Sequence, residues 1–260
     1  MSIKYNKIKL WEGEKHMVKF ETYVVGSEKG EAYWALKNTI PLEDKYMHYR
    51  LDGACLNDCV DIYFVAHEDG KALCRIWMCY PRHENAICNW GAVYTLEECR
   101  GRGICNKTLA FCMDEIAKLE NSPVGLFCTS GQQWITDMYL KFGFTTAITG
   151  MTKGPLYRPL ADSPKTFNEL CEKYYTPAKS LRTVKATWEW RNEIDCLLNF
   201  AFTEMKSDYS VNGIRDLWSM LLNGTDKDVK VILTDTNKCV GWMVDGQYTI
   251  HPNYKGMKID

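Results

Sequence analysis

The loop at residues 100–105 carries the residues best suited to bind an anion. It reads Arg100-Gly101-Arg102-Gly103-Ile104-Cys105, and a helical pattern follows it. Glycines at 101 and 103 let the backbone turn sharply and let a ligand approach closely. The first turn of a helix leaves N–H groups without partners and carries partial positive charge. With two arginines added, the loop predicts a phosphate or pyrophosphate site.

Other interpretations of this loop follow from the same residues. It is not a Walker A loop, because no Gly-Lys-Ser or Gly-Lys-Thr follows, and it lacks the Gly-x-Gly-x-x-Gly spacing of a dinucleotide-binding turn. A solvated loop that happens to hold two glycines and two arginines is an equal alternative on these residues alone. The surrounding elements and a second motif decide between them.

The elements expected around the loop place it between a strand and a helix. A helix is indicated by apolar residues at three- and four-residue spacing after the loop, namely Leu109, Cys112, Met113, Ile116 and Leu119. The other predicted elements are a strand at 18–24, a helix at 31–38, strands at 60–67, 72–80 and 86–96, a strand at 124–129, a helix at 132–141 and a strand ending at 148. This order predicts a mixed α/β fold in which three antiparallel strands lead into a strand–loop–helix unit.

A second motif, Met138-Tyr139-Leu140-Lys141-Phe142-Gly143-Phe144, follows later in the chain. The two motifs together resemble the GNAT superfamily of acetyl-CoA-dependent N-acetyltransferases. In that family the loop reads Arg/Gln-x-x-Gly-x-Gly/Ala, and the later signature reads Leu-Tyr-x-Lys-x-Gly-Phe. The family's strand ending, Leu-x-Val-x-Pro-x-Tyr-Arg-Gly, is similar to the run from Val93 to Gly101. The resemblance covers about residues 60–150.

The resemblance implies a GNAT-like acyl-CoA N-acyltransferase fold with acetyl-CoA as the cosubstrate. The pantetheine arm would pair with the backbone of residues 93–95 like an added strand, and the pyrophosphate would lie on the N–H groups of residues 102–106. The residues expected to bind the cosubstrate are Val93, Tyr94, Thr95, Arg100, Gly101, Arg102, Gly103, Ile104, Cys105, Asn106, Gln132 and Tyr139. The chain departs from the family pattern at Cys105, Glu97 and Gln132, each of which still fits its place.

The implied mechanism is direct attack of an amine on the thioester. A strand N–H would polarise the thioester carbonyl, and Tyr139 would donate a proton to the departing thiolate. Without the motif, Tyr139 would be read as a core residue. Glu97 and Glu98 are candidate bases, with solvated loop charges as the alternative, and His83 in a loop is a weaker candidate. A covalent cysteine mechanism is not expected, because no histidine is placed to pair with a thiol.

The C-terminal hundred residues predict a second, smaller unit. Strands are expected at 181–186, 229–234 and 239–244, and helices at 189–205 and 211–222. The run from Tyr248 to Gly256 resembles the family's strand ending, so about 180–256 would be the front half of an incomplete GNAT unit. The alternative is an unrelated α+β cap. Neither would hold a glycine loop or a catalytic tyrosine.

The predicted organisation is therefore an acetyltransferase domain at 1–150, a connector at 151–180 and a C-terminal partial GNAT-like or α+β domain at 181–260. Four of the eight prolines lie in the connector and are expected to interrupt regular structure, except for a short helix from Thr166 to Tyr174.

Composition limits the classes of partner. The 260 residues contain 32 Lys+Arg and 33 Asp+Glu, and the net charge of -1 argues against a nucleic-acid partner. No apolar run approaches a membrane span, and the N-terminus does not read as a secretory signal, so we expect a cytoplasmic protein. The 12 cysteines form no C-x-x-C pair and the five histidines show no ligand spacing, so we expect reduced, buried thiols and no metal site.

The function expected from the sequence is transfer of an acetyl group from acetyl-CoA to a primary amine. The identity of the acceptor stays open, and a homodimer is one expected arrangement. The main alternative is a non-catalytic acyl-CoA-binding or regulatory module on the same fold. A structural interaction protein that does not bind CoA is the third.

Overall fold

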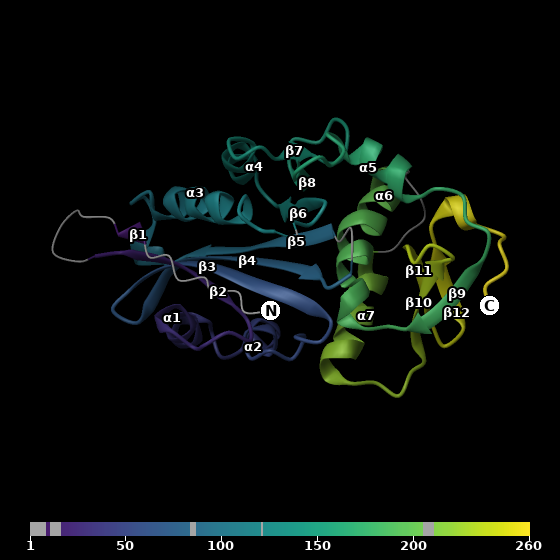
Figure 1. Ribbon diagram of the computed structural model, residues 1–260, viewed down its shortest axis with the longest axis horizontal. Coiled ribbons are helices and arrows are strands. Elements are labelled where there is room, and N and C mark those ends of the chain that lie inside the picture. The colour runs from purple at the N-terminus through teal and green to yellow at the C-terminus, as the bar shows by residue number, and fades with distance from the viewer. Residues whose placement is uncertain (1–8, 11–16, 84–86, 121, 205–210) are drawn as a thin grey trace. The chain divides into compact units, whose positions relative to one another are not determined.

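The computed structural model describes residues 9–10, 17–83, 87–120, 122–204 and 211–260 (Figure 1). The chain forms two compact units. The first comprises residues 1–79 and 90–122, and the second comprises residues 80–89 and 123–260. Among the described residues, no helix has both the length and the apolar character needed to cross a membrane.

The first unit is a sheet with helices on both faces. Its elements are β1 (Lys9–Leu10), β2 (Lys19–Val24), α1 (Glu31–Thr39), α2 (Lys45–Leu51), β3 (Cys59–Glu68), β4 (Lys71–Pro81), β5 (Ile87–Thr95), a 3₁₀ turn (Glu97–Cys99) and α3 (Ile104–Ile116). The strands are ordered β1-β2-β3-β4-β5, and the tip of β4 and the start of β5 belong to the second unit. Helices α1 and α2 lie on one side of the sheet and α3 on the other (Figure 1).

Burial on both faces explains the composition of β3 and β4. Nearly every residue of these strands is buried, as expected for a sheet covered by helices on both sides. Asp69 and Gly70 connect them in a two-residue turn with φ of 46° and 73°, the positive values that a tight hairpin requires. On the α3 side, the Phe111 ring lies 6.0 Å from that of Phe20 and 6.5 Å from that of Phe64.

The predicted elements of this unit are confirmed with small changes of boundary. The three strands predicted before the loop are β3, β4 and β5, and the predicted helix at 31–38 is α1. The helix after the loop ends at Ile116, so Leu119 lies beyond it. Ala86, the first residue of the third predicted strand, lies outside the described residues.

The second unit begins with a smaller group of strands and helices. Its elements are β6 (Gly125–Ser130), α4 (Gln133–Leu140), β7 (Thr145–Thr146), β8 (Gly154–Pro159) and α5 (Phe167–Tyr174). The strand order is β5-β6-β8-β7. β6 runs parallel to Ile87–Asn89 of β5 and antiparallel to β8. The Phe127 ring of β6 contacts the rings of Tyr157, Phe167 and Phe200 at 5.0, 5.8 and 5.6 Å between centroids.

The expectation that prolines prevent regular structure after residue 150 was wrong for β8. Pro155 and Pro159 lie within this strand, opposite Thr129 and Gly125 of β6. On the other edge of β8, β7 pairs only with Leu156 and Tyr157. The prolines therefore take positions that need no ladder N–H toward β7, where a missing donor costs little. The short helix was predicted correctly: Thr166 caps α5 and forms a capping box with Glu169.

The rest of the second unit is a four-stranded antiparallel sheet with helical segments. Its elements are β9 (Leu181–Lys185), a 3₁₀ turn (Trp188–Trp190), a π-helical segment (Glu193–Leu198), α6 (Asn199–Glu204), α7 (Val211–Asn223), β10 (Val229–Thr234), β11 (Cys239–Val244), β12 (Gln247–Ile250) and a 3₁₀ turn (Pro252–Tyr254). The order is β12-β11-β10-β9. The helix predicted at 189–205 is thus a succession of three helical types, and Met205 lies outside the described residues.

The two units share a local plan. In each, a strand and helical segments precede three consecutive strands, and the order β2-β3-β4-β5 has its counterpart in β9-β10-β11-β12. The last strand ends alike: Leu96 N–H donates to Leu73 O at 2.9 Å, and His251 N–H donates to Val240 O at 2.8 Å. A 3₁₀ turn and a left-handed glycine follow, at Gly101 (φ 75°) and Gly256 (φ 88°).

After that glycine the two chain paths differ. The segment after Gly101 enters α3, whereas Ile259 forms a parallel bridge with Leu181 at the edge of β9.

The cysteines behave as small core residues. None of the twelve is in a disulfide, and all but Cys105 and Cys171 are buried. They are distributed over the cores of both units, as expected for side chains that pack like small hydrophobes.

Candidate functional site

The glycine loop has the backbone conformation that an anion site requires. Gly101 and Gly103 both have left-handed φ values, 75° and 73°, a conformation that side-chain-bearing residues avoid. Gly103 is also the N-cap of α3. The two glycines therefore permit the backbone turn that leads into α3.

The start of α3 is open and uncapped. A Cβ built at Gly101 or at Gly103 would meet no atom within 4 Å. No side chain among the described residues caps the helix. The N–H groups of the first turn of any helix lack intrahelical acceptors and carry partial positive charge. Open space in front of such donors fits a bound phosphate group.

The two loop arginines are available at this surface. Arg100 and Arg102 are exposed. Arg100 makes only a long ion pair with Glu97, with 4.0 Å between Nη1 and Oε1, and Arg102 Nη1 lies 3.9 Å from Cys99 Sγ. An exposed ion pair at that distance holds its partners weakly, so both guanidinium groups can turn toward an anion.

Cys105 lies in the first turn of α3 and has an acidified thiol. A hydrogen bond from Cys74, with a further one from Thr95, lowers the pKa of Cys105 to about 7, whereas burial acts in the opposite direction. The pKa of Cys74 is raised, because its S–H is the donor of this pair. Thr95 Oγ1 also lies 3.4 Å from Cys74 Sγ. A thiolate at a helix N-terminus is the usual form of a reactive cysteine.

The strand residues predicted to pair with pantetheine lie at the end of β5. The ladder between β5 and β6 ends at Asn89, so Val93, Tyr94 and Thr95 lie beyond it. Ala92 has a φ of 46°, an irregularity just before them. The Tyr94 ring is exposed and lies 4.8 Å from the Arg75 guanidinium carbon.

Gln132 and Tyr139 belong to the second unit, at the two ends of α4. Gln132 is the exposed N-cap residue of α4, and its Oε1 accepts a hydrogen bond from the Trp134 indole. Tyr139 is buried, with its ring 5.7 Å from that of Phe144. Gly143 ends the helix with a φ of 83°, and Arg158 Nε donates to the carbonyl of Phe142 at 2.7 Å. The tyrosine motif is thus a defined helix end and not an irregular loop.

The three candidate bases have different surroundings. Glu97 and Glu98 are exposed, and the Glu97 side chain is 87% exposed. His83 is not the isolated loop histidine that the sequence suggested. Its Nε2 lies 2.7 Å from Glu193 Oε1, and its Nδ1 lies 3.3 Å from Glu189 Oε1.

The two carboxylates raise the pKa of His83. Burial opposes the charge, but the hydrogen bond and the charge of Glu193, joined by those of Glu189, outweigh it and raise the pKa of His83. An imidazolium that donates from both nitrogens has no lone pair left to accept a proton. His83 is therefore better suited to hold the two carboxylates in place than to act as a base.

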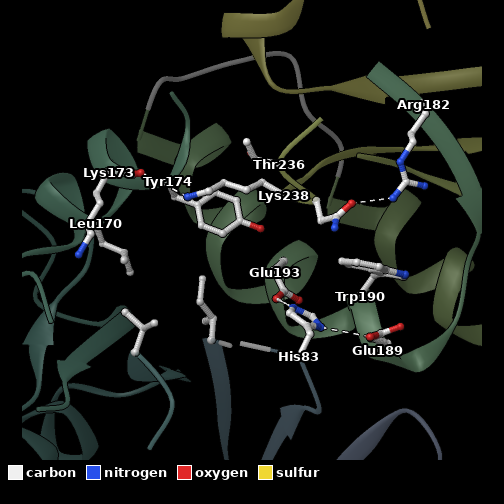
Figure 2. Close-up of a pocket in the computed structure, with 13 residues that line it drawn as sticks. His83, Leu170, Lys173, Tyr174, Arg182, Glu189, Trp190, Glu193, Thr236 and Lys238 are labelled. Carbon is white, nitrogen blue, oxygen red and sulfur yellow. Dashed lines mark hydrogen bonds and ion pairs between the residues drawn. The ribbon is translucent and has the colours of Figure 1, made fainter. Parts of the chain in front are cut away.

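Figure 2 shows this cluster at the wall of a cavity of about 610 Å³ within the second unit. Glu189 and Glu193 are functional candidates that were not predicted from the sequence. Their i, i+4 spacing places them on one face of a helix, and this was the signal available in the sequence. No local pattern could have paired them with His83, which is more than a hundred residues earlier.

A second acidic cluster lies in the first unit. Ligand atoms of Glu21, Glu31 and His67 all lie within 4.8 Å of one another. His67 Nε2 is 3.0 Å from Glu21 Oε2, and Lys19 Nζ is 2.5 Å from Glu31 Oε2. The lysine already pairs with one of the two carboxylates.

Comparison with known families identifies the type of domain that contains the glycine loop and the tyrosine motif. Residues 60–146 match the family model described as acetyltransferase (GNAT) domain. This stretch is a GNAT domain. It includes β3 to α3 of the first unit and β6 to β7 of the second, with the glycine loop and the tyrosine motif inside it. The resemblance stated from the two motifs is confirmed.

Several solved structures are similar to part of this chain. An acyl-CoA N-acyltransferase from Pseudomonas aeruginosa is 16% identical, with a TM-score of 0.39, over 54% of this chain and 99% of that chain. A GNAT family N-acetyltransferase (YhbS) from Escherichia coli in complex with CoA is 13% identical, with a TM-score of 0.36, over 62% of this chain and 87% of that chain. AtaTR bound with AcCoA is 15% identical, with a TM-score of 0.37, over 54% of this chain and 92% of that chain. No curated protein matches the sequence.

Proposed function

We propose that this protein is an acyl-CoA-dependent N-acyltransferase that transfers an acetyl group from acetyl-CoA to a primary amine. The observation that carries the proposal is the uncapped start of α3 behind two left-handed glycines, inside a GNAT domain. Backbone N–H groups of residues 102–106 bind the pyrophosphate, and Arg100 and Arg102 add charge. Backbone groups of Val93, Tyr94 and Thr95 bind the pantetheine arm as an added strand.

The same proposal assigns the chemical step to a direct transfer. A strand N–H donates to the thioester carbonyl and stabilises the charge that develops there. Tyr139 donates its phenolic proton to the departing thiolate, and Gln132 helps to hold the cosubstrate. The amine must lose a proton before it attacks. A water chain, or Glu97, takes that proton, since both nitrogens of His83 already lie against carboxylates.

A measurement of product formation distinguishes an enzyme from a CoA-binding module that has no catalytic activity. The protein is incubated with acetyl-CoA and a panel of primary amines, and acetylated product is detected by mass spectrometry. Thiol reagents are avoided because the protein contributes twelve cysteine thiols of its own. Product with at least one amine is expected. Measurable CoA binding without product from any amine would favour the regulatory module.

Tyr139→Phe tests the acid. We expect a loss of turnover of about 100-fold with CoA binding retained, the usual effect of removing a general acid. Tyr157→Phe is the matched control, since Tyr157 is a buried tyrosine of the same unit whose hydroxyl donates to Pro164 O at 2.7 Å. Equal turnover in the two variants would remove Tyr139 from the mechanism.

We further propose that residues 181–256 are the front half of a second GNAT unit. The shared strand order and the shared turn after the last strand support this origin. The segment after Gly256 instead pairs with β9 through Ile259 and Leu181, so we do not expect this half to bind acyl-CoA in the manner of the first.

A further inference from the structure

The cavity in the second unit has an anionic wall and a cationic wall. Figure 2 shows His83, Glu189, Trp190 and Glu193 together on one side. All thirteen lining residues belong to residues 80–89 and 123–260, so the cavity lies within one compact unit. No step proposed for acetyl transfer uses it.

Glu193 is the group that most needs a further partner. Its side chain is 1% exposed, and its Oε1 accepts from His83 at 2.7 Å. Its Oε2 has no hydrogen-bond partner among the described residues. A buried carboxylate oxygen without a donor costs free energy that a donor would recover. Glu193 also begins a π-helical segment, a rare backbone form that recurs at functional sites.

The neighbours of Glu193 favour a cationic ligand group. Glu189 is one-third exposed and shares His83, so the cluster holds two carboxylates for one imidazolium. The Trp190 ring stacks on His83, with 5.0 Å between centroids, and fixes its orientation. A primary ammonium group supplies three donors and one positive charge, which is what the cluster lacks.

The other wall lacks anions. Lys173, Arg182 and Lys238 line it, and no ion pair joins any of them to a carboxylate among the described residues. Lys238 Nζ lies 4.6 Å from the centre of the Tyr174 ring, and burial, followed by repulsion from Lys173, lowers the pKa of Lys238. Arg182 Nη2 donates to Asn237 Oδ1 at 2.7 Å, which holds the guanidinium in place. Lys173 and Lys238, whose charges act on each other and have no counter-ion among the described residues, suit a carboxylate or phosphate group.

We propose that this cavity binds a small aliphatic zwitterion, with its ammonium group at Glu193 and Glu189 and its anionic group at Lys238. Ile87, Val124 and Leu170 line the cavity as well, and they contact the aliphatic part of the ligand. The site is independent of acyl-CoA, so its occupancy can be measured without the cosubstrate.

Three probes separate the two ends of the ligand. They are 6-aminohexanoate, hexylamine and hexanoate, and their binding is measured by calorimetry on the full chain without CoA. 6-Aminohexanoate should bind at least about tenfold more tightly than either single-ended probe, because each charged contact contributes of the order of one factor of ten. Equal binding of the three probes, or no binding, would overturn the proposal.

Substitutions test which residues bind the ammonium end and which bind the carboxylate end of the ligand. Glu193→Gln should weaken 6-aminohexanoate and hexylamine by about tenfold and leave hexanoate unchanged. Lys238→Met should weaken 6-aminohexanoate and hexanoate and leave hexylamine unchanged. Glu189→Gln, at a more exposed residue, repeats the first test in case Glu193→Gln impairs folding, which thermal unfolding checks.

The matched controls are Asp226→Asn and Lys227→Met, which change the same charges at exposed residues outside the lining. They should bind all three probes as the unmodified protein does. If Glu193→Gln and Glu189→Gln bind hexylamine as Asp226→Asn does, the anionic wall does not bind the ammonium group and the proposal fails.

Discussion

The Arg50 guanidinium of α2 makes two hydrogen bonds to the carboxylate of Asp61 on β3, from Nε to Oδ1 at 2.8 Å and from Nη2 to Oδ2 at 2.9 Å. Both side chains are buried, at 0% and 2% exposure. The Trp77 indole donates to Asp61 Oδ1 at 2.8 Å, and Cys79 Sγ lies 2.8 Å from Arg50 Nη2. This network joins α2 to the centre of the first unit's sheet.

Asp61→Asn should therefore destabilise the protein severely. It leaves the Arg50 charge buried without its counter-ion, and breaking a buried pair in this way costs about 3–5 kcal/mol. The free energy of unfolding in urea measures the loss. The exposed pair of Lys37 Nζ and Asp52 Oδ2, at 2.7 Å, is the control: Asp52→Asn should cost less than about 1 kcal/mol. Similar losses in the two variants would contradict the assignment.

Substitution of two glycines that have the same backbone conformation tests whether the glycine loop binds the pyrophosphate. Gly103 and Gly70 both have a φ of 73°, and a Cβ at either meets nothing within 4 Å. Glu at either position should cost about 1–2 kcal/mol of strain. Only Gly103→Glu should also abolish the rise in melting temperature that CoA produces, because only that carboxylate repels the pyrophosphate. If the CoA shift survives in Gly103→Glu, the loop is not the phosphate site.

Cys105 should be alkylated at unusually low pH. Its pKa of about 7 makes it half ionised near neutrality, and iodoacetamide reacts with the thiolate. The rate at Cys105, followed by peptide mass spectrometry, should rise through pH 7. Thr95→Val removes one donor to the thiolate and should shift the rise to higher pH.

CoA protection gives a second readout of the same thiol. CoA should slow alkylation of Cys105 and leave Cys171, the other partly exposed thiol, unchanged. Slowing of both thiols alike would point to a general effect of CoA on the protein.

His251 should make the protein acid-sensitive. Burial lowers the pKa of His251 to about 4, and its ring stacks on Tyr175 with 3.9 Å between centroids. In the unfolded chain a histidine titrates near 6.5. Between these values the unfolded state binds the extra proton, so the free energy of unfolding falls as pH drops from about 6.5 to about 4, by on the order of 3 kcal/mol.

His251→Asn removes this titration and keeps an acceptor for the N–H of Asn253, which now donates to His251 Nδ1 at 3.2 Å. The variant's stability should fall less than that of the unmodified protein over that pH range. His83 titrates in the opposite direction, because its raised pKa adds stability that is lost as pH rises. Parallel pH profiles for the two proteins would contradict the assignment to His251.

Glycine positions and apolar spacing predicted the parts of the candidate site whose structure depends on a few neighbouring residues. The loop at 100–105, the helix after it and the helix end at Gly143 each depend on glycine conformation and on apolar spacing over a few residues. Those features can be read without knowing the fold. The strand β8 could not, because what permits its prolines is the shortness of β7, a tertiary property.

The cavity of the second unit could not be predicted from local patterns either, because it depends on tertiary contacts. His83 and Glu193 meet only because the chain folds back over more than a hundred residues, and the π-helical segment that begins at Glu193 has no sequence signature. Sequence reasoning therefore treated His83 as a surface residue and a weak base. The structure instead makes it the link between two carboxylates.

The distribution of buried thiols allows local unfolding of the protein to be measured. Each unit has its own set of buried cysteines, such as Cys59 and Cys112 in the first and Cys196 and Cys239 in the second. A buried thiol reacts only when its surroundings unfold transiently. Pulse labelling under native conditions, resolved by peptide mass, would thus report the opening free energy of each unit separately and without any introduced probe.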